Sequence, residues 1–526
     1  MTTKSHISKI LLAGCATAAL SACGADDIAS PGTGGNITIN NPSPTPSPTP
    51  TPTPTPSVVA AGGCPTIADP AGLTDRGTLT SPQGSWRVCE LPAQFTASTT
   101  LPKIAGLLYS LGGRVDVGSD LGTSGGSGIT LTIDPGVIVF GNTGVSWLAV
   151  NRGNKIQAVG TASQPIIFTS RDNALGISSD TSSGQWGGVV LLGRAPITDC
   201  AAPSAAPGTT ACERDTEGAS SPALYGGATA NDSSGRMSYV QIRYSGYVLS
   251  ADKELQGLTP SGIGTGTVLD HIQIHNSSDD GIEFFGGSPQ MKNVVITGAE
   301  DDSLDIDTGA KALIQYVIAV QRTDKGDSMI EGDSDNSFDV QNPRTNLRLT
   351  NFTFLANALS GNGAAIMMRG GMDANLSNGV VVSPGQPCLQ LRNAKTIAAA
   401  DAADDNLGPP IFNSVVMQCS STPYASHSTV TAAQTQTIFE SGSNNNAAFT
   451  PSLTAIVTGS AAFVNGANET GATAIDPKTV NAFFDTTNYV GAVKDAADTW
   501  YQGWTCNSST ASFGGSSTAC TVLPTA

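Results

Sequence analysis

The segment LDHIQIHNSSDDGIEFFGGSPQMKNVVITGAEDDSLDI, residues 269–306, contains two similar units in succession. LDHIQI at 269–274 recurs as MKNVVI at 291–296, and DDGIEF at 279–284 recurs as DDSLDI at 301–306; both offsets are 22 residues. Apolar residues alternate with polar ones in these units, which is typical of short strands with one buried face. Gly and Pro between the units indicate turns. The segment therefore predicts a repeat of about 22 residues built from short strands and turns.

The same rhythm continues on both sides of this segment. Upstream, short strands alternate with Gly or Pro turns in LTIDPGVIVFG at 131–141, WLAVNRGNKIQAVGTASQPIIFTS at 147–170 and WGGVVLLGRAPI at 186–197. Downstream, β-rich stretches follow one another at offsets of 23, 35, 27 and 35 residues: IQYVIA at 314–319, LTNFTF at 349–354, LSNGVV at 376–381 and IFNSVV at 411–416. The repeats lack the Leu pattern of leucine-rich repeats and any helical period. They predict an all-β chain folded as a parallel β-helix, with coils stacked about 4.8 Å apart.

Stacked coils would align equivalent side chains in columns along the axis. One column is expected to contain Asn293, Asn351, Asn378 and Asn413, together with His271 and Tyr316. Stacked amide side chains are expected to hydrogen-bond to one another. His271 is then more readily a polar member of this column than a metal ligand, although His275 on the same strand face leaves a two-histidine site open.

The coils resemble those of the right-handed, pectate-lyase-like β-helix superfamily over roughly residues 100–420. The upstream runs, the two acidic repeats and the closing YVGAVKDAADTWYQGWTC at 489–506 are similar to a group of secreted bacterial β-helix proteins. The resemblance implies the right-handed parallel β-helix. It implies no single activity, because one fold hosts many functions.

The repeated acids predict a binding site. If the two DD units occupy the same place in successive coils, Asp280 stacks on Asp302 and Glu283 stacks on Asp305. Carboxylates this close share a proton or a cation. Several oxygen ligands suit Ca²⁺ better than zinc or copper, so we expect calcium at Asp280, Glu283, Asp302, Asp305 and Asp327. The alternative is that these acids cap turns and point into solvent.

The resemblance also implies catalytic roles for some of these acids. Polygalacturonases of this superfamily carry an NTD motif, a DD pair about one coil later, then GHG and RIK. Ser278-Asp279-Asp280 is similar to the first motif and Asp301-Asp302 to the second, which makes Asp280, Asp301 and Asp302 the catalytic candidates. Lys325-Gly326-Asp327-Ser328 stands where GHG is expected, and no RIK follows. Hydrolysis by paired carboxylates therefore stays open without a complete motif.

Pectate lyases imply a second chemistry for the same region. They hold Ca²⁺ between acids of neighbouring coils and use an arginine as the base. Four arginines are available in this chain, and no local motif selects one of them: Arg322, Arg344, Arg369 and Arg392.

Composition fits these expectations. The 526 residues include 60 Gly and 31 Pro, with 13% charged and 6% aromatic residues, which suits an elongated all-β protein. A formal net charge of −17 repels nucleic acid, so no nucleic-acid partner is expected. The sequence has no P-loop and no HExxH motif. No nucleotide, haem or zinc cofactor is expected.

The N-terminus predicts a lipoprotein signal over residues 1–22. Lys4 and Lys9 precede an apolar run from 10 to 20 that is too short to span a bilayer. The run ends in Leu-Ser-Ala-Cys, which resembles the bacterial lipobox, so Cys23 is expected to be acylated. An ordinary secretory signal with a chance cysteine is the alternative. By resemblance to lipoprotein sorting, the absence of Asp directly after Cys23 indicates an outer-membrane lipoprotein, facing the periplasm or the cell surface.

A tether and three further regions complete the predicted organisation. Residues 23–60 form a lipid-anchored Pro/Thr-rich linker, in which every second residue from 42 to 56 is proline and favours an extended chain. Residues 61–120 are assigned to an N-terminal cap region, 121–420 to the parallel β-helix, and 421–526 to a C-terminal cap region.

Eight cysteines remain after Cys15 and Cys23. Their even number in an exported chain predicts disulfides, and their spacing favours sequence-local pairs. The pairs are Cys64 with Cys89, Cys200 with Cys212, Cys388 with Cys419, and Cys506 with Cys520. No CxxC is present, which disfavours a zinc cluster.

The leading functional hypothesis is a lipid-anchored protein of the cell envelope. It would bind an extracellular ligand, in the first place a polysaccharide, through an acidic and calcium-loaded face. Its partners would be the membrane, reached through the lipid, and a glycan, another extracellular polymer or an outer-membrane protein. Two alternatives stay open: a polysaccharide-degrading hydrolase or lyase, and an adhesion or receptor-associated protein without catalysis.

Overall fold

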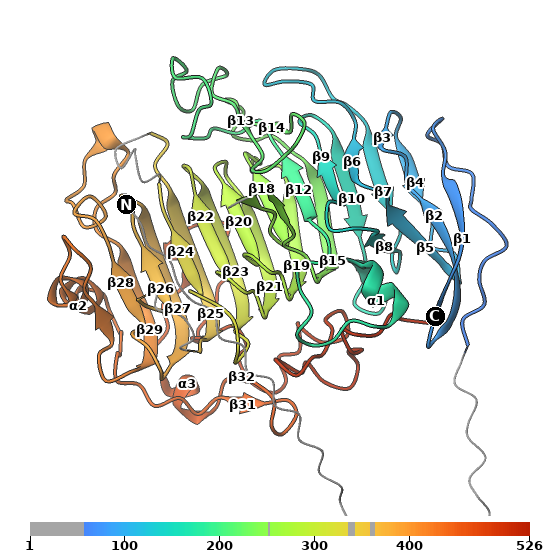
Figure 1. The fold of residues 1–526 in the computed structure, drawn as a ribbon. Coiled ribbons are helices and arrows are strands. Elements are labelled where there is room, and N and C mark those ends of the chain that lie inside the picture. Colours follow the sequence, from blue (N-terminus) through green and yellow to red (C-terminus); the bar gives the residue numbers. More distant parts are fainter. Residues whose placement is uncertain (1–56, 251–252, 335–341, 358–362, 526) are drawn as a thin grey trace, which may run out of the picture. The chain divides into compact units, whose positions relative to one another are not determined.

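The computed structural model describes residues 57–250, 253–334, 342–357 and 363–525 (Figure 1). All of them belong to one compact unit, Pro54–Ala526. No helix among these residues is long and apolar enough to cross a membrane.

Two large, mainly parallel sheets form the body. The first is a 15-stranded sheet. Its main path is, in spatial order, β1 (Thr74–Ser81), β2 (Gly84–Glu90), β5 (Leu107–Leu111), β8 (Ile138–Gly141), β11 (Ile166–Ser170), β15 (Gly235–Arg243), β19 (Val268–His275), β21 (Gln290–Thr297), β23 (Lys311–Val320), β25 (Asn346–Leu355), β27 (Asp373–Ser383) and β29 (Ile411–Cys419). A side branch contains β4 (Thr99–Leu101), β7 (Thr130–Ile133) and β10 (Lys155–Val159).

The second sheet is 11-stranded. Its order is β3 (Gln94–Phe95), β6 (Arg114–Val117), β9 (Trp147–Val150), β12 (Gly188–Leu192), β18 (Leu258–Ser261), β20 (Ile282–Phe285), β22 (Leu304–Asp307), β24 (Ile330–Gly332), β26 (Ile366–Met368), β28 (Leu389–Leu391) and β30 (Tyr424–Ala425).

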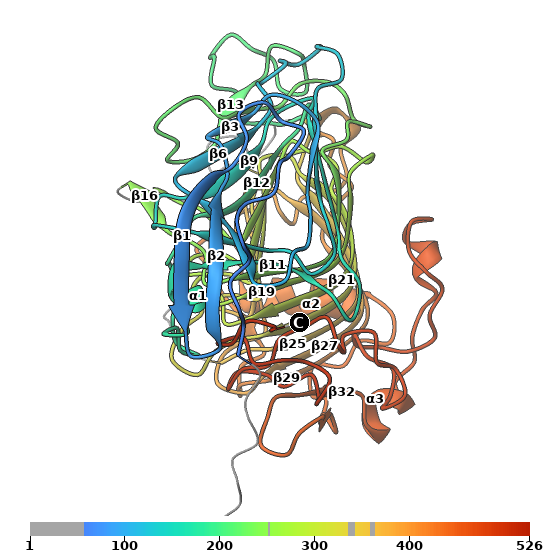
Figure 2. The same ribbon diagram turned by 90° about the vertical axis from the view of Figure 1, so that its right-hand side faces the viewer.

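The chain alternates between the two sheets, so each coil places a strand in both. β19 is followed by β20 in the other sheet, and then β21 pairs in parallel with β19, with Leu269 opposite Met291. β20 pairs with β22 in the same way, with Ile282 opposite Leu304. Both register offsets equal the 22-residue repeat of the sequence. The predicted all-β parallel β-helix is therefore confirmed, and Figure 2 views its coils from the β1 end.

The core lies between the two sheets. Alternate residues of each strand point inward, as Ile282 and Phe284 of β20 and Ile272 and Ile274 of β19 do, and all four are buried completely. Burying one such side chain stabilises the fold by about 1.5–3 kcal/mol. The same alternation turns Glu283 and Phe285 of β20 outward.

Short elements complete the chain. They are three hairpins, β13 (Arg214–Asp215) with β14 (Leu224–Tyr225), β16 (Val248–Ser250) with β17 (Lys253–Glu254), and β31 (Thr454–Ala455) with β32 (Ala462–Val464), and the helices α1 (Arg171–Leu175), α2 (Ala432–Ser441), α3 (Ala467–Gly471), η1 (Ala402–Asp404) and η2 (Pro477–Thr479). α2 begins with a capping box between Thr431 and Gln434. Its Phe439 packs on Phe412 and Tyr424, at ring-centroid distances of 5.4 and 5.8 Å, and covers the last coil.

The expected polar column is present, with two corrections. Its members share a positive φ: Tyr239, His271, Asn293, Tyr316, Asn351, Asn378 and Ser414. Ser414, rather than Asn413, occupies the last place, because Asn413 pairs with Ser377, the residue before Asn378. A short polar side chain such as Asn tolerates this left-handed backbone better than most others.

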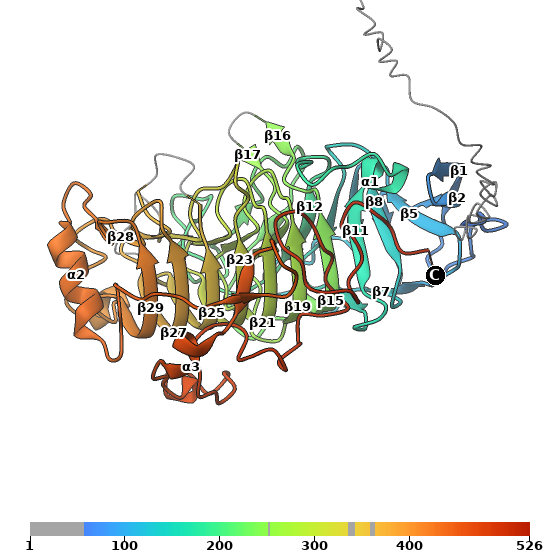
Figure 3. The same ribbon diagram turned by 90° about the horizontal axis from the view of Figure 1, so that it is seen from below.

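The Asn side chains of the column do not bond mainly to one another, which is the second correction. The Nδ2 atom of Asn351 donates to the Tyr489 carbonyl at 3.0 Å, and that of Asn378 donates to the Ile475 carbonyl at 2.9 Å. Gln273 on β19 binds the backbone of Cys506 in both directions, at 2.7 and 3.1 Å. These amides hold the C-terminal segment, residues 450–525, along the outside of the first sheet (Figure 3).

All four predicted disulfides are confirmed. Their sulfur atoms lie at bonding distance, between 1.97 and 2.04 Å: Cys64 with Cys89, Cys200 with Cys212, Cys388 with Cys419, and Cys506 with Cys520.

Candidate cation-binding site

The acidic repeats meet on the outer face of the second sheet. Glu283 of β20 lies directly opposite Asp305 of β22, which in turn lies opposite Glu331 of β24. This register confirms the predicted stacking of Glu283 on Asp305. Because paired strands lie about 4.8 Å apart, three carboxylates follow one another at one strand spacing.

The DD units stack in the turns that precede these strands. The Asp302 backbone N–H donates to Oδ1 of Asp280 at 2.8 Å, and the Ser328 N–H donates to Oδ1 of Asp302 at 2.5 Å. Gly281 allows this close approach, because a Cβ there would lie 2.7 Å from the Ser303 carbonyl oxygen. Each carboxylate therefore binds the backbone of the next coil.

The exposed fractions of these acids decide between the two hypotheses, a buried cation site and turn-capping acids that point into solvent. Asp280, Glu283 and Asp302 are only 6%, 8% and 4% exposed. The alternative in which the acids cap turns and point into solvent is therefore wrong for these three, although Asp280 and Asp302 do accept backbone N–H groups.

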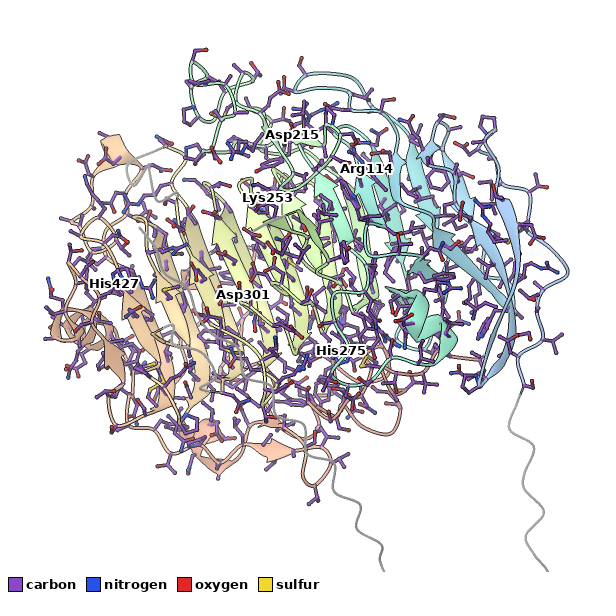
Figure 4. All side chains as sticks on the ribbon, in the orientation of Figure 1. Arg114, Asp215, Lys253, His275, Asp301 and His427 are labelled. Carbon is purple, nitrogen blue, oxygen red and sulfur yellow. A yellow bond between two sulfur atoms is a disulfide. The ribbon has the colours of Figure 1, made fainter. Side chains whose placement is uncertain are left out.

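Seven carboxylates form what we call the carboxylate cluster. Three overlapping groups each offer ligand oxygens within 4.8 Å of one another, and these groups could hold a metal ion: Asp279, Asp280 and Asp301; Asp280, Glu283 and Asp305; Asp301, Asp302 and Asp327. The cluster contains all five predicted calcium ligands, and it adds Asp279 and Asp301, the first residues of the two DD units. Figure 4 labels Asp301. The role of these side chains as ligands stays a prediction.

The pKa values of five carboxyl groups of the cluster are raised: those of Asp279, Asp280, Glu283, Asp302 and Asp305. Burial, with repulsion from neighbouring carboxylates, holds the pKa of Asp280, Glu283, Asp302 and Asp305 well above the ordinary value. Burial and the nearby Asp301 raise the pKa of Asp279 to about 7. No ion pair joins any of these five residues to a basic side chain in the part of the chain that the structure describes. A bound cation would favour the ionised forms.

One arginine reaches the edge of the cluster. Arg369 follows β26, and it forms ion pairs with Glu331 at 2.7 Å and with Asp333 at 2.9 Å. Arg392, one coil further, donates to the Gln390 side chain at 2.6 Å. The outer face thus changes from acidic at β20, β22 and β24 to basic at the ends of β26 and β28.

The other two arginines singled out from the sequence pair with different acids. Arg322 binds Glu300 and Asp324, at 2.9 and 2.6 Å, and Arg344 lies 3.3 Å from Asp373. The local sequence around Arg369 holds no motif, so only the stacking of β26 on β24 identifies it.

His271 and His275 do not belong to the carboxylate cluster. Nδ1 of His271 lies 2.7 Å from Asp270, and the ring stacks on Tyr239 with centroids 4.2 Å apart. Burial lowers the pKa of His275 to about 3, and its Nδ1 bonds to Thr297 at 2.9 Å. Neither belongs to a group of three or more potential metal ligands among the described residues.

One cavity lies away from the carboxylate cluster and has fewer groups available to bind a ligand or to catalyse a reaction. Its volume is about 680 Å³, and it is lined by residues that follow β23, β25 and β27 and by the C-terminal segment. Its arginine, Arg322, is already paired with two acids. The chemistry of the carboxylate cluster, rather than cavity size, therefore selects the candidate site.

Comparison with known proteins identifies one family model. A model described as a pectate-lyase like beta helix domain matches residues 109–505. No curated protein and no solved structure matches the chain. The matched range includes every coil that carries the carboxylate cluster.

Proposed function

Because the chain belongs to the pectate-lyase-like β-helix family, which suggests a polysaccharide-related function, we propose that it binds a polysaccharide on the outer face of the second sheet, with calcium as part of the site. The observation that carries this proposal is the burial of Asp280, Glu283 and Asp302, none of which forms an ion pair with a basic side chain among the described residues. Two ionised carboxylates in such a place repel each other, and a divalent cation removes that repulsion.

The geometry around Asp305 supports a cation. Its Oδ1 atom is buried and has no hydrogen-bond partner in the described parts of the chain. Asp280, Glu283 and Asp305 offer oxygens within 4.8 Å of one another. Ca²⁺ takes six to eight oxygen ligands at about 2.3–2.6 Å in flexible arrangements. Three carboxylates leave coordination positions open, which hydroxyl or carboxylate oxygens of a sugar can fill.

A glycan screen tests this function. The purified protein is expected to retain one class of polysaccharide in millimolar calcium and to release it in chelator. Asp302→Asn is expected to weaken retention, whereas Asp485→Asn, which changes an exposed acid beside the first sheet, is expected to leave it unchanged. Retention that ignores both chelator and Asp302→Asn would contradict the calcium site. Failure to retain any polysaccharide would contradict the function itself.

Cleavage of the bound polysaccharide is a second candidate. A carboxyl whose pKa is about 7, as in Asp279, suits a general acid at neutral pH, and Asp301 offers a second carboxylate close by. Retaining glycosidases place two carboxyl groups about 5–5.5 Å apart. Asp280, Asp301 and Asp302 stay the catalytic candidates beside Asp279.

Product release separates the two candidates. For an enzyme, reducing ends or unsaturated sugar ends should accumulate when the retained polysaccharide is incubated with the protein, and Asp301→Asn should lower their rate of formation more than it lowers retention. Retention without any product assigns the chain to binding or adhesion.

The proposed location is the outer membrane, through a lipid on Cys23, a residue outside those that the structure describes. Cys23→Ala is expected to release the protein from the membrane fraction, because the acylated residue is lost. Cys15→Ala, which changes a second cysteine of the apolar run, is the matched control and should fractionate as wild type. Membrane retention of the Cys23→Ala protein would overturn the lipid anchor.

A further inference from the structure

A second cavity lies beside the carboxylate cluster, and we call it the hairpin cavity. Its volume is about 530 Å³. The β13–β14 hairpin, β17 and the outer faces of β20 and β22 form its walls, and Figure 4 labels Asp215 and Lys253 among its residues. It shares Glu283 with the cluster. Its size falls within the range of pockets that hold small organic ligands.

Negative charge dominates the cavity wall. Five carboxylates line it against two basic side chains: Asp199, Asp215, Glu217, Glu283 and Asp307 against Arg214 and Lys253. Both basic side chains already bind acids of the same wall. Arg214 lies 3.1 Å from Asp199, and Lys253 lies 2.9 Å from Glu217. The cavity therefore favours a cation over an anion.

The cavity is also aromatic, which distinguishes it from a simple ion site. Phe285 turns outward from β20, and Tyr225 comes from β14; their ring centroids lie 6.1 Å apart and the rings are tilted by 44°. Aromatic faces attract ammonium groups through their quadrupole and also offer apolar surface. A ligand with a positive charge on an otherwise weakly polar ring matches both properties.

A buried hydroxyl offers a further polar contact. Thr308 lines the same cavity and is 6% exposed, and its Oγ1 atom has no hydrogen-bond partner among the described residues. A buried hydroxyl without a partner costs free energy, because it has lost its hydrogen bonds to water. A ligand that carries hydroxyl groups would remove this cost.

We infer that the hairpin cavity is a subsite for a protonated amino sugar of the bound polysaccharide. The inference rests on the proposed function and names its substrate class: a glycan with free amino groups on its hexose units. The ammonium group lies between Asp307 and Asp215, the sugar ring packs on Phe285, and a ring hydroxyl bonds to Thr308.

The cluster and the cavity have different tasks in this arrangement. Calcium in the cluster binds sugar oxygens, whereas the hairpin cavity needs no metal because the ligand brings the positive charge. Asp302 belongs to the cluster and is not among the residues that line the cavity. Asp302→Asn therefore changes the cluster without changing a residue of the cavity wall.

The test uses glucosamine oligosaccharides and their fully N-acetylated counterparts of equal length, titrated calorimetrically in chelator at slightly acidic pH, where the free amines are protonated. The wild type is expected to bind the amine form at least tenfold more tightly than the acetylated form. Asp307→Asn should weaken this binding about tenfold, and Phe285→Ala should weaken it by a similar factor. Asn keeps an acceptor for the Thr308 N–H that Asp307 binds at 2.7 Å, so the variant loses charge without losing that bond.

One control variant, Asp485→Asn, and one control ligand, the N-acetylated oligosaccharide, distinguish the possible outcomes. Asp485→Asn removes one charge outside the cavity, and it should leave affinity unchanged; a loss equal to that of Asp307→Asn would mean nonspecific attraction to an acidic protein and would overturn the inference. Equal affinity for both oligosaccharides would overturn it as well. If the glycan screen finds only polysaccharides without amino groups, the proposed function stands and this inference falls. If amine binding persists in chelator while no calcium-dependent retention is found, the subsite stands and the calcium site falls.

Discussion

In chelator, the protein is expected to lose stability as the pH rises from 6.5 to 8.5. Asp280, Glu283, Asp302 and Asp305 have folded-state pKa values well above the ordinary value, so the folded chain keeps protons that the unfolded chain has already released. Where the folded state binds more protons, the free energy of unfolding falls with increasing pH. The loss is about 1.4 kcal/mol per pH unit for each carboxyl that stays protonated in the folded chain.

His275 changes the stability in the opposite direction, but it does so mainly below pH 6.5. Burial lowers the pKa of His275 to about 3, so this side chain makes the protein more stable as the pH rises towards 6.5, the value of an unperturbed histidine. Above pH 6.5 that gain is complete. Acids with lowered pKa values, such as Asp120 and Asp270, have finished titrating well below this interval.

Melting temperatures measured by calorimetry or circular dichroism check this expectation. A domain of this length loses about 1 °C for each kcal/mol, so each carboxyl that stays protonated lowers the melting temperature by about 1.4 °C per pH unit. Asp302→Asn should flatten the dependence, because one titrating group is gone. A melting temperature that is constant or rises over this interval in chelator would contradict the raised pKa values.

Calcium is expected to raise the melting temperature at neutral pH. An ion that binds only the folded state, present at a hundredfold excess over its dissociation constant, stabilises it by about 2.7 kcal/mol. For a chain of this length the gain is about 3 °C. Calcium should also weaken the pH dependence described above, since it keeps the cluster ionised in the folded state.

Asp302→Asn provides the sharpest comparison. The asparagine retains an oxygen acceptor for the Ser328 N–H and removes a carboxyl that the folded chain keeps protonated in chelator. The variant should therefore melt higher than wild type in chelator and gain less from calcium. Asp485→Asn changes an exposed carboxylate that pairs with Lys292 and bonds to the Tyr316 side chain, outside the cluster, and it should keep the wild-type calcium response. Identical calcium responses in all three proteins would place any bound calcium away from the cluster.

Much of the fold follows from short-range sequence signals. The 22-residue offset between DDGIEF and DDSLDI fixes the register of β20 on β22, because in-register parallel strands repeat with the coil. Local spacing likewise predicted every disulfide. Column assignment went wrong at Asn413, because Ile411 and Phe412 are both apolar and either could take the inward place that Leu376 has in the preceding coil. The structure gives this place to Phe412 and leaves Ile411 exposed.

The parts of the site that sequence reasoning missed depend on long-range contacts. The β13–β14 hairpin lies about 60–90 residues before the acids that it covers, Glu283 and Asp307, and no repeat links them. Arg369 meets Glu331 only because β26 stacks on β24. The raised pKa of Asp279 results from burial, which a carboxyl-rich sequence does not reveal.

Titration of calcium into the protein at pH 7.5, in two buffers of different ionisation enthalpy, tests most directly whether the carboxylate cluster is a cation site. We expect saturable binding to the wild type, accompanied by proton release, because the ion displaces protons that Asp280, Glu283, Asp302 and Asp305 retain in its absence. Asp302→Asn should bind calcium at least tenfold more weakly and release fewer protons. The absence of saturable binding, or binding without proton release that Asp302→Asn leaves unchanged, would contradict the account.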